Sequence, residues 1–184
     1  MIGRINIGLL NRIIIDDVLL DDQSGQEMLK VTRLSAKFDI MPFFKGKISI
    51  SSVQLFGFNI NLRKETPDSP PNFKFVLDAF ASKDTVKKEN SLDLRINSIL
   101  IRRGRMSYHV LSEEETPGKF NAKHIQLQNI IANISLKALS KDSLNLGIKR
   151  LSLDEKASGF SLKKMSLKLV ANNKKAYHDY FILE

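Results

Sequence analysis

The stretch LRINSILIRRGRMSYHV, residues 94–110, alternates apolar and polar residues and then breaks that alternation once. Leu94 and Ile96 predict an inward-facing residue at position 98, because side chains of a strand alternate between two faces with a period of two. The next apolar residue is Ile99, so the pair Asn97-Ser98 contains one residue too many. Such an extra residue is typical of a β-bulge, which sets two residues against one and bends the strand.

The same pattern, with two polar residues between two apolar pairs, occurs seven times along the chain. The polar pairs lie at 16–17, 32–33, 51–52, 97–98, 123–124, 149–150 and 163–164. A helix would place its apolar residues three or four apart, whereas these segments place them mainly two apart. The spacing therefore predicts an internal repeat of bent strands. Bulges at matched positions would curve a sheet along its whole length.

The connections predict an antiparallel meander with one or two short helices. Turn-forming residues at 21–25, 113–118 and 154–159 separate consecutive strand signals. One short helix is expected at 42–45, and a second over about 73–83, where Phe73, Val76, Leu77 and Phe80 have helical spacing. The chain then divides into a first β block at 1–64, a linker with a short helix at 65–92, and a second β block at 93–184 that continues the first.

The fold class predicted is mainly β, a curved antiparallel repeat sheet shaped as a groove. The apolar positions of the repeat predict the residues of one sheet face. They are Ile13, Ile15, Val18, Leu20, Leu29, Val31, Leu34, Ile48, Ile50, Val53, Leu55, Leu94, Ile96, Ile99, Ile101, Phe120, Ile125, Leu127, Leu146, Ile148, Leu151, Leu153, Phe160, Leu162, Met165 and Leu167. An apolar sheet face needs a cover, which is a second sheet in a closed sandwich or a ligand in an open trough. The spacing of residues leaves both open.

Composition and charge limit the partners. The chain of 184 residues has no cysteine, which excludes a disulfide scaffold and a cysteine zinc site. No apolar run reaches the ~18 residues of a membrane-spanning helix, so we expect a soluble chain whose anchor or export signal would lie upstream. The formal net charge is +9, and residues 119–175 hold twelve Lys or Arg against three acids. This excess suits an acidic partner or a membrane surface, but lysines also solvate the outer faces and edges of strands.

The sequence offers little material for catalysis. His109, His124 and His178 stand apart in the sequence, and the acids at 113–115 and 16–17 have the pattern of a loop and of a bulge. Phosphate-binding loops and nucleophile elbows are absent. Aromatic residues for base stacking are sparse in the basic half, which disfavours nucleic acid. We therefore expect no enzyme, no catalytic or metal-binding residues, no cofactor and no nucleic-acid partner.

Residues 5–65 carry a resemblance to a known family. The run INIGLLNRIIIDDVLLDDQSGQEMLKVTRLSAKFDIMPFFKGKISISSVQLFGFNINLRKE resembles the amino-terminal periplasmic segment of TamB-like proteins in the AsmA-like superfamily. The points of likeness are IDDVLLDD-x-x-G, the L-x-V-x-x-L-x-A strand, a short helix ending at Gly46, and KISISSVQLFGFNINLRKE. NFKFVLDAFAS at 72–82 and LDLRINSILIRRGRMSYHV at 92–110 are similar to the next elements of that family.

This resemblance implies a function for the apolar face. It implies a piece of a long protein of the Gram-negative envelope, anchored in the inner membrane, with a β-rich periplasmic body. The groove of such a protein carries phospholipid acyl chains between membranes, and the protein works with an outer-membrane barrel partner in outer-membrane biogenesis. The alternative is a passive β-sandwich that serves as an interaction or scaffold module with a filled core.

Overall fold

The computed structural model describes residues 1–9, 11–39, 48–81, 92–93, 97–140, 143–172 and 175–184. These residues form one helix, α2 (Lys74–Ala81), and ten strands. The strands are β1 (Ile5–Gly8), β2 (Arg12–Asp21), β3 (Glu27–Phe38), β4 (Ile48–Lys64), β5 (Leu92–Asp93), β6 (Ser98–Val110), β7 (His124–Ser140), β8 (Ser143–Glu155), β9 (Ser161–Asn172) and β10 (Ala176–Leu183). The helix expected at 42–45 lies outside the described residues, and α2 is the helix predicted over about 73–83.

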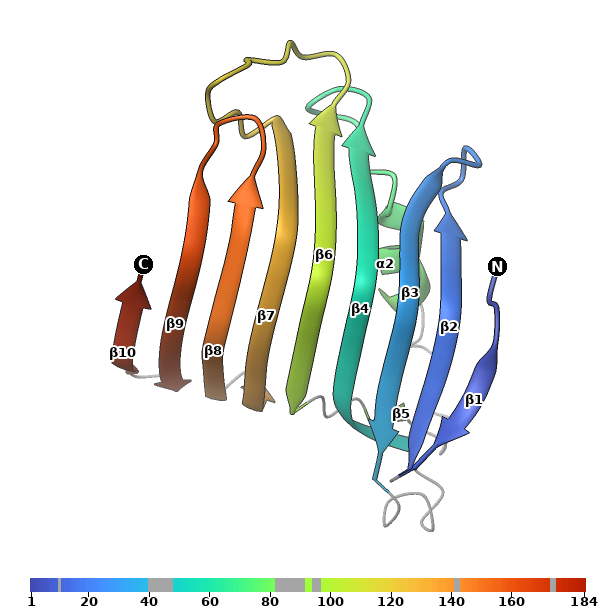
Figure 1. The fold of residues 1–184 in the computed structure, drawn as a ribbon, viewed down its shortest axis with the longest axis vertical. Coiled ribbons are helices and arrows are strands. Elements are labelled where there is room, and N and C mark those ends of the chain that lie inside the picture. The colour runs from blue at the N-terminus through green and yellow to red at the C-terminus, as the bar shows by residue number, and fades with distance from the viewer. Residues whose placement is uncertain (10, 40–47, 82–91, 94–96, 141–142, 173–174) are drawn as a thin grey trace.

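A single open sheet makes up nearly all of the described chain (Figure 1). Its strands follow the order β1-β2-β3-β4-β6-β7-β8-β9-β10, and β5 pairs with β4 beside this path. The described residues contain no second sheet stacked on the first, so they form no sandwich. The prediction of a mainly β, curved repeat sheet is confirmed.

One connection departs from the predicted meander. β4 and β6 are parallel, with Val53 opposite Ile99, whereas every other neighbouring pair on the path is antiparallel. Parallel neighbours need a crossover that returns the chain to the end where the first strand began. The segment 65–97 makes this crossover and contains α2.

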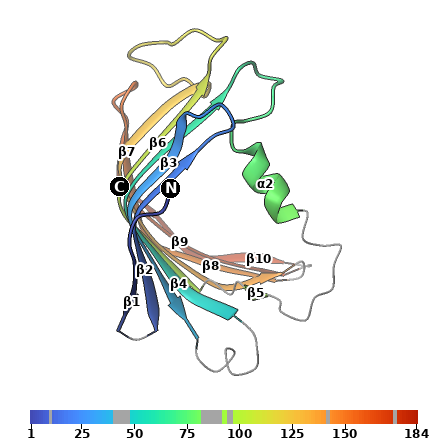
Figure 2. The ribbon, with the colours of Figure 1, turned by 90° about the vertical axis from the view of Figure 1, so that its right-hand side faces the viewer.

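The sheet is bent so strongly that its strands form a C-shaped profile when they are seen along the sheet (Figure 2). α2 lies on the concave side. Among the described residues, no Cα atom of α2 comes within 8 Å of a Cα atom in any strand. Figure 1 looks at the opposite, convex face, where the strands pass in front of the helix.

Interruptions of the strand pairing account for the bend. At three of the seven predicted pairs, 51–52, 149–150 and 163–164, the register shifts, so these bulges are confirmed. At 16–17 and 32–33 the pairing leaves out Asp17 and Thr32, one residue from each strand, without a register shift, so these pairs do not set two residues against one. The pairs at 97–98 and 123–124 mark instead the starts of β6 and β7, and their prediction as bulges is wrong. The irregularities in the middle of these strands lie five residues further on, near Arg103 and Asn129.

Backbone angles mark these interruptions. Asp17, Gly57, Arg103 and Asn129 have φ between 54° and 63°, the left-handed region, and each lies in a different strand. A left-handed residue in a strand is a feature of bulges that strengthen the local twist. The positions where the pairing is interrupted in β2, β3, β4, β6 and β7, at Asp17, Thr32, Gly57, Arg103 and Asn129, lie next to one another and run across the sheet as a band. The sheet therefore bends along this band.

The small core of the molecule lies in this bend. Val31, Phe58 and Ile130 are buried against one another, and partly buried side chains of six strands surround them. The Phe58 ring lies over Gly104, so that a Cβ atom built there would be 2.3 Å from the ring. Bending brings side chains of the concave face together, which lets them bury one another without a second layer.

Candidate functional site

Two rows of apolar side chains cross the nine strands from β1 to β10 that form the main path of the sheet, without β5. Residues directly opposite each other in paired strands point to the same face. The first row is Ile7, Ile13, Ala36, Val53, Ile99, Ile134, Ile148, Leu167 and Phe181. The second row is Ile5, Ile15, Leu34, Leu55, Ile101, Ala132, Leu151, Met165 and Leu183. No polar residue interrupts either row, and we call the face that carries them the apolar face.

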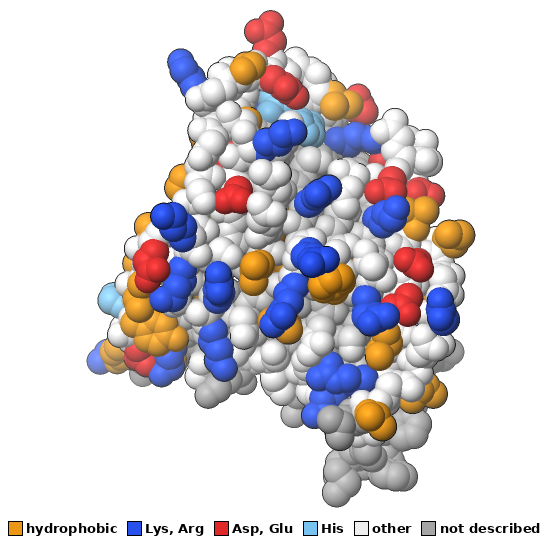
Figure 3. Space-filling model, viewed as in Figure 1, with side chains coloured by type: hydrophobic (Ala, Val, Ile, Leu, Met, Phe, Trp, Pro, Cys, Tyr) orange, Lys and Arg blue, Asp and Glu red, His pale blue; other side chains and the backbone are white. Residues whose placement is uncertain are grey.

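The residues of the opposite face are mostly polar. A row beside the first is Arg12, Lys37, Ser52, Ser98, Ser135, Gly147, Lys168 and Tyr180. Figure 3 shows Lys and Arg side chains spread over the convex face, with hydrophobic groups scattered between them. The polar rows therefore point outward, and the apolar face is the concave face over which α2 stands.

The charges of the convex face are partly paired. Arg33 binds Asp16 at 2.6 Å, and its hydrogen bond lowers the pKa of that carboxyl. Lys168 pairs with Asp179, and the Arg103 guanidinium lies 5.2 Å from the centre of the Phe56 ring, a cation–π distance. The convex face is thus a solvated surface.

The apolar face is only half-buried. The described residues include no large side chain that is fully buried, and most members of the two rows have intermediate exposure. Near its centre the face is closed by the cluster around Phe58, and away from the bend its side chains meet solvent. Apolar surface left in water costs about 25 cal/mol per Å². A face of this extent therefore favours an apolar occupant.

The structure places most of the residues predicted for this face in the rows or directly beside them. Val18, Leu29 and Leu127 pack around the central cluster, and Leu153 does so from β8. Leu20, Ile50, Ile125, Leu146 and Leu162 pair with apolar residues in the same alternation. Leu94 and Ile96 lie outside the described residues, and nothing is described of the Ile48 side chain.

Two predicted residues lie off the sheet. Phe120 precedes β7 in the loop that follows β6, and Phe160 lies in the hairpin between β8 and β9. Their side chains are 64% and 57% exposed, respectively. Each precedes its strand by one residue or more, so the pattern extended the strands too far toward their amino-terminal ends.

Sequence reasoning missed members of the face in several strands. Ile5 and Ile7 of β1, Ile134 of β7, and Phe181 of β10 belong to the rows but not to the predicted set. The signal was present as plain alternation, for example Ala132-x-Ile134-x-Leu136. A search for the interrupted pattern alone does not find the apolar residues of strands whose alternation is not interrupted at that point.

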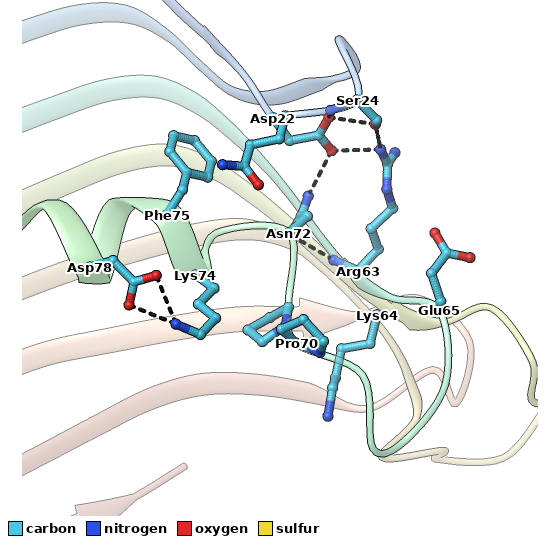
Figure 4. Close-up of a pocket in the computed structure, with 12 residues that line it drawn as sticks. Asp22, Ser24, Arg63, Lys64, Glu65, Pro70, Asn72, Lys74, Phe75 and Asp78 are labelled. Atoms are coloured by element: carbon cyan, nitrogen blue, oxygen red, sulfur yellow. Dashed lines mark hydrogen bonds and ion pairs between the residues drawn. The ribbon is translucent and has the colours of Figure 1, made fainter.

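A polar pocket lies where the crossover leaves β4 (Figure 4). Its volume is about 250 Å³, and Asp22, Arg63 and Asn72 meet in it. Arg63 binds the Asp22 carboxylate at 2.5 Å, and Asn72 donates to Asp22 at 3.3 Å and accepts from the Arg63 backbone at 3.1 Å. Each of these polar groups has an ion-pair or hydrogen-bond partner among the others. Together they anchor the crossover to the sheet.

The Asp22 carboxyl is strongly perturbed in this anchor. Its burial acts to raise the pKa, but hydrogen bonds from Ser24, Gln26 and Asn72 outweigh burial and lower it to about 2. Asp22 is therefore charged at neutral pH and complements Arg63. Such a group holds structure together and has no proton to donate in catalysis.

Two histidines that stand 15 residues apart in the sequence meet in the sheet. His109 of β6 pairs with His124 of β7, and their Nδ1 atoms are 3.0 Å apart. His178 lies in β10 and is exposed. The sequence alone did not predict the contact between His109 and His124, because the pairing of β6 with β7 brings them together and their spacing in the sequence does not indicate it.

The sequence was compared with protein-family models and with curated proteins. In the described chain, no helix has both the length and the apolar character needed to cross a membrane. No protein-family model matches the sequence, and no curated protein matches it.

Proposed function

We propose that this chain is a periplasmic segment of an envelope-spanning protein whose apolar face shelters phospholipid acyl chains during transport from the inner to the outer membrane. The observation that carries the proposal is the pair of apolar rows, which cross nine strands without a polar residue. The face is concave and has no second sheet over it in the described chain. These properties suit a ligand that is long, apolar and able to slide.

The energetics favour an apolar face for this task. Exposing an acyl chain to water costs about 0.8 kcal/mol of free energy per CH₂. For a tail of about sixteen carbons, apolar contacts must therefore offset roughly 12 kcal/mol. A basic surface supplies only about 1 kcal/mol per Lys or Arg near an anionic membrane. The lysines of the convex face therefore cannot replace apolar shelter, although they suit attraction to an anionic surface.

The direction of the bend sets the path of the ligand. Because each strand curves along its own length, the concavity runs from β1 to β10, across the strands. Nine strands have eight intervals of ~4.8 Å, so the path is about 38 Å long. β1 and β10 have no further neighbour in the described chain. In a longer protein, further strands at these edges would lengthen the same path.

The proposed cellular setting follows from the resemblance to TamB-like proteins. The partners we propose are phospholipid acyl chains, the rest of the same long chain, and an outer-membrane barrel protein bound through other regions. The protein is placed in the periplasm with an inner-membrane anchor, and it acts without catalysis, cofactor or nucleic acid.

Crosslinking at adjacent positions tests the proposal. A photo-crosslinking residue at Ile99 points to the apolar face, and one at Leu100 points to the convex face. We expect phospholipid adducts at Ile99 in cells and none at Leu100, together with phospholipid in the extract of natively purified protein. Adducts to protein alone at Ile99, without lipid in the extract, would establish the scaffold alternative.

A further inference from the structure

Three side chains of types that can bind a metal ion lie close together at the end of the sheet where β6 ends and β7 begins. The Nδ1 atoms of His109 and His124 lie 3.0 Å apart. The Glu115 carboxylate oxygen lies 3.8 Å from the first nitrogen and 4.0 Å from the second. In the part of the chain that the structure describes, this is the group of three whose ligand atoms all lie within 4.8 Å of one another.

A hydrogen bond fixes the orientation and tautomer of the His124 ring in a form that can bind a metal ion. His124 is 7% exposed, and its Nε2 lies 2.9 Å from the backbone oxygen of Glu113. A carbonyl oxygen only accepts, so Nε2 carries the hydrogen, and Nδ1 of the neutral ring carries a lone pair that faces His109 Nδ1. Metal-bound histidines commonly donate their second ring N–H to a backbone carbonyl in this way.

The distances suit one ion shared by the three groups. Zinc–nitrogen bonds of 2.0–2.1 Å allow two ligand atoms to lie at most about 4.2 Å apart, and about 3.3 Å apart at a tetrahedral angle. The two nitrogens are already close to that separation. Glu115 needs only a small approach, and its side chain is 62% exposed on the loop between β6 and β7.

We propose that His109, His124 and Glu115 bind a divalent first-row transition ion of the Zn²⁺ class. Two imidazoles with one carboxylate favour such an ion over Mg²⁺ or Ca²⁺, which prefer oxygen ligands. Three protein ligands leave a coordination position for water. When the ion binds to neutral rings, the hydrogen that His109 Nδ1 shares with His124 moves to Nε2 of His109.

The surroundings leave room for the ion. Glu115 and His124 line a cavity of about 280 Å³ that Asn121, Gln126 and Lys156 also border, and His109 lines a second cavity that shares Gln126 and Lys156 with the first. Lys156 is exposed, and Lys123 is paired with Glu113 at 2.6 Å. Neither lysine therefore has to point its charge at the ligand atoms.

The site lies on the convex face, away from the apolar rows. Tyr108 and Ile125 pair within the alternation of the apolar face, so the next pair, His109 and His124, points the opposite way. Figure 3 shows histidine side chains gathered near the top of the convex face. A bound ion would join the loop between β6 and β7 to the sheet. Because the site lies on the convex face, binding of an ion there does not depend on acyl chains at the apolar face.

Metal titration of the 184-residue chain tests the site. Titration with Co²⁺, followed by its visible absorption, and displacement by Zn²⁺ should give one ion per chain, with no competition from Mg²⁺. His109→Gln and Glu115→Gln should each lower the affinity for Zn²⁺ by at least about tenfold. Bound Zn²⁺ should also raise the melting temperature of the wild-type chain but not of these variants.

Matched variants separate the site from chance binding. Glu114→Gln changes the neighbouring loop acid, and His178→Ala removes the exposed histidine outside the group; both should bind Zn²⁺ as the wild type does. The proposal is overturned by a wild-type chain that binds no Co²⁺, or by Glu115→Gln and His109→Gln variants that bind as tightly as Glu114→Gln. Far-ultraviolet circular dichroism of each variant checks that the sheet has formed.

Discussion

At the scale of the residue, two glycines of neighbouring strands have different tasks. Gly57 lies where the pairing of β3 and β4 is interrupted, and it adopts φ of 63°, which is strained for other residues. Gly104 has no such angle, but it leaves space for the ring of Phe58, which covers it from the next strand. Gly57 therefore supplies backbone freedom, whereas Gly104 supplies the space in which the core of the bend packs.

Substitution of Gly104 tests this packing. In Gly104→Ala the new Cβ would lie 2.3 Å from the Phe58 ring and 3.0 Å from Ile130. Overpacking of this kind typically costs about 1–3 kcal/mol, and we expect the free energy of unfolding in urea to fall by that amount. The smaller side chain in Phe58→Leu should recover part of the loss in the double variant. Strictly additive effects of the two changes would show that ring and glycine do not share the space.

At the scale of the element, a buried carboxylate closes the hairpin between β8 and β9. Glu155 accepts hydrogen bonds from the backbone of Gln126, Ala157 and Ser158, and from the Ser158 hydroxyl. Burial acts to raise the pKa of Glu155, but these hydrogen bonds, led by those from Ser158, outweigh it and lower the pKa to about 2. The hairpin is therefore stabilised by a charge on the apolar face, opposite Leu127 at the end of β8 and outside the two rows.

Acid titration tests the role of Glu155. Because its folded-state pKa lies below the ordinary value of about 4.5, its contribution is complete above that pH and is lost as pH falls toward 2. A shift of this size corresponds to up to about 3 kcal/mol. Glu155→Gln should lower stability at pH 7 and flatten the loss of stability between pH 4.5 and 2, measured by urea unfolding at each pH.

Two comparisons make that result specific. Asp22 titrates in a similar acid range, so the Glu155→Gln variant should keep the part of the acid dependence that Asp22 contributes. Glu114→Gln, in an exposed loop, should leave the whole profile unchanged. If Glu155→Gln has the same pH profile as the wild type, the hairpin does not depend on the charge.

At the scale of the whole molecule, the sheet keeps one wet face and one apolar face that only its own curvature partly covers. The central cluster closes the bend, while the ends of the rows, in β1 and β10, are exposed. An isolated layer of this kind gains less from burial than a sandwich of equal length would. Stability and occupancy of the apolar face are therefore expected to be coupled, since a bound apolar ligand removes exposed surface from water.

Charge placed in the middle of the rows tests the role of the apolar face. Ile99→Lys and Val53→Lys introduce an ammonium group at facing positions of β6 and β4. We expect the fold to survive, because half-exposed lysines can extend their charge to solvent. Phospholipid recovered with the purified chain should fall several-fold, since a charge in the path interrupts the apolar contact; lipid mass spectrometry measures it.

The matched control for this prediction is Leu100→Lys, one residue away on the convex face. It should leave both circular dichroism and lipid recovery as in the wild type. If Ile99→Lys and Val53→Lys unfold the chain instead, these positions are ordinary core, and the apolar face has no need of a ligand.

The sequence by itself determined the local features of this protein. Alternation with a period of two predicted strands, polar pairs predicted some of their bulges, and helical spacing predicted α2, because each depends on residues close together in the chain. The same alternation identified the apolar face, since a residue's face follows from its position within its strand.

Only the tertiary structure decided which strands became neighbours. The parallel pairing of β4 and β6 depends on a crossover of more than thirty residues, for which strand alternation carries no signal. Pairing of β6 with β7 brought His109 to His124, and pairing of β4 with β6 brought Phe58 over Gly104. Bulges at Arg103 and Asn129, and one open layer in place of a sandwich, also follow from contacts between distant residues. The energies of such contacts depend on the register of whole strands, and a local pattern does not contain that register.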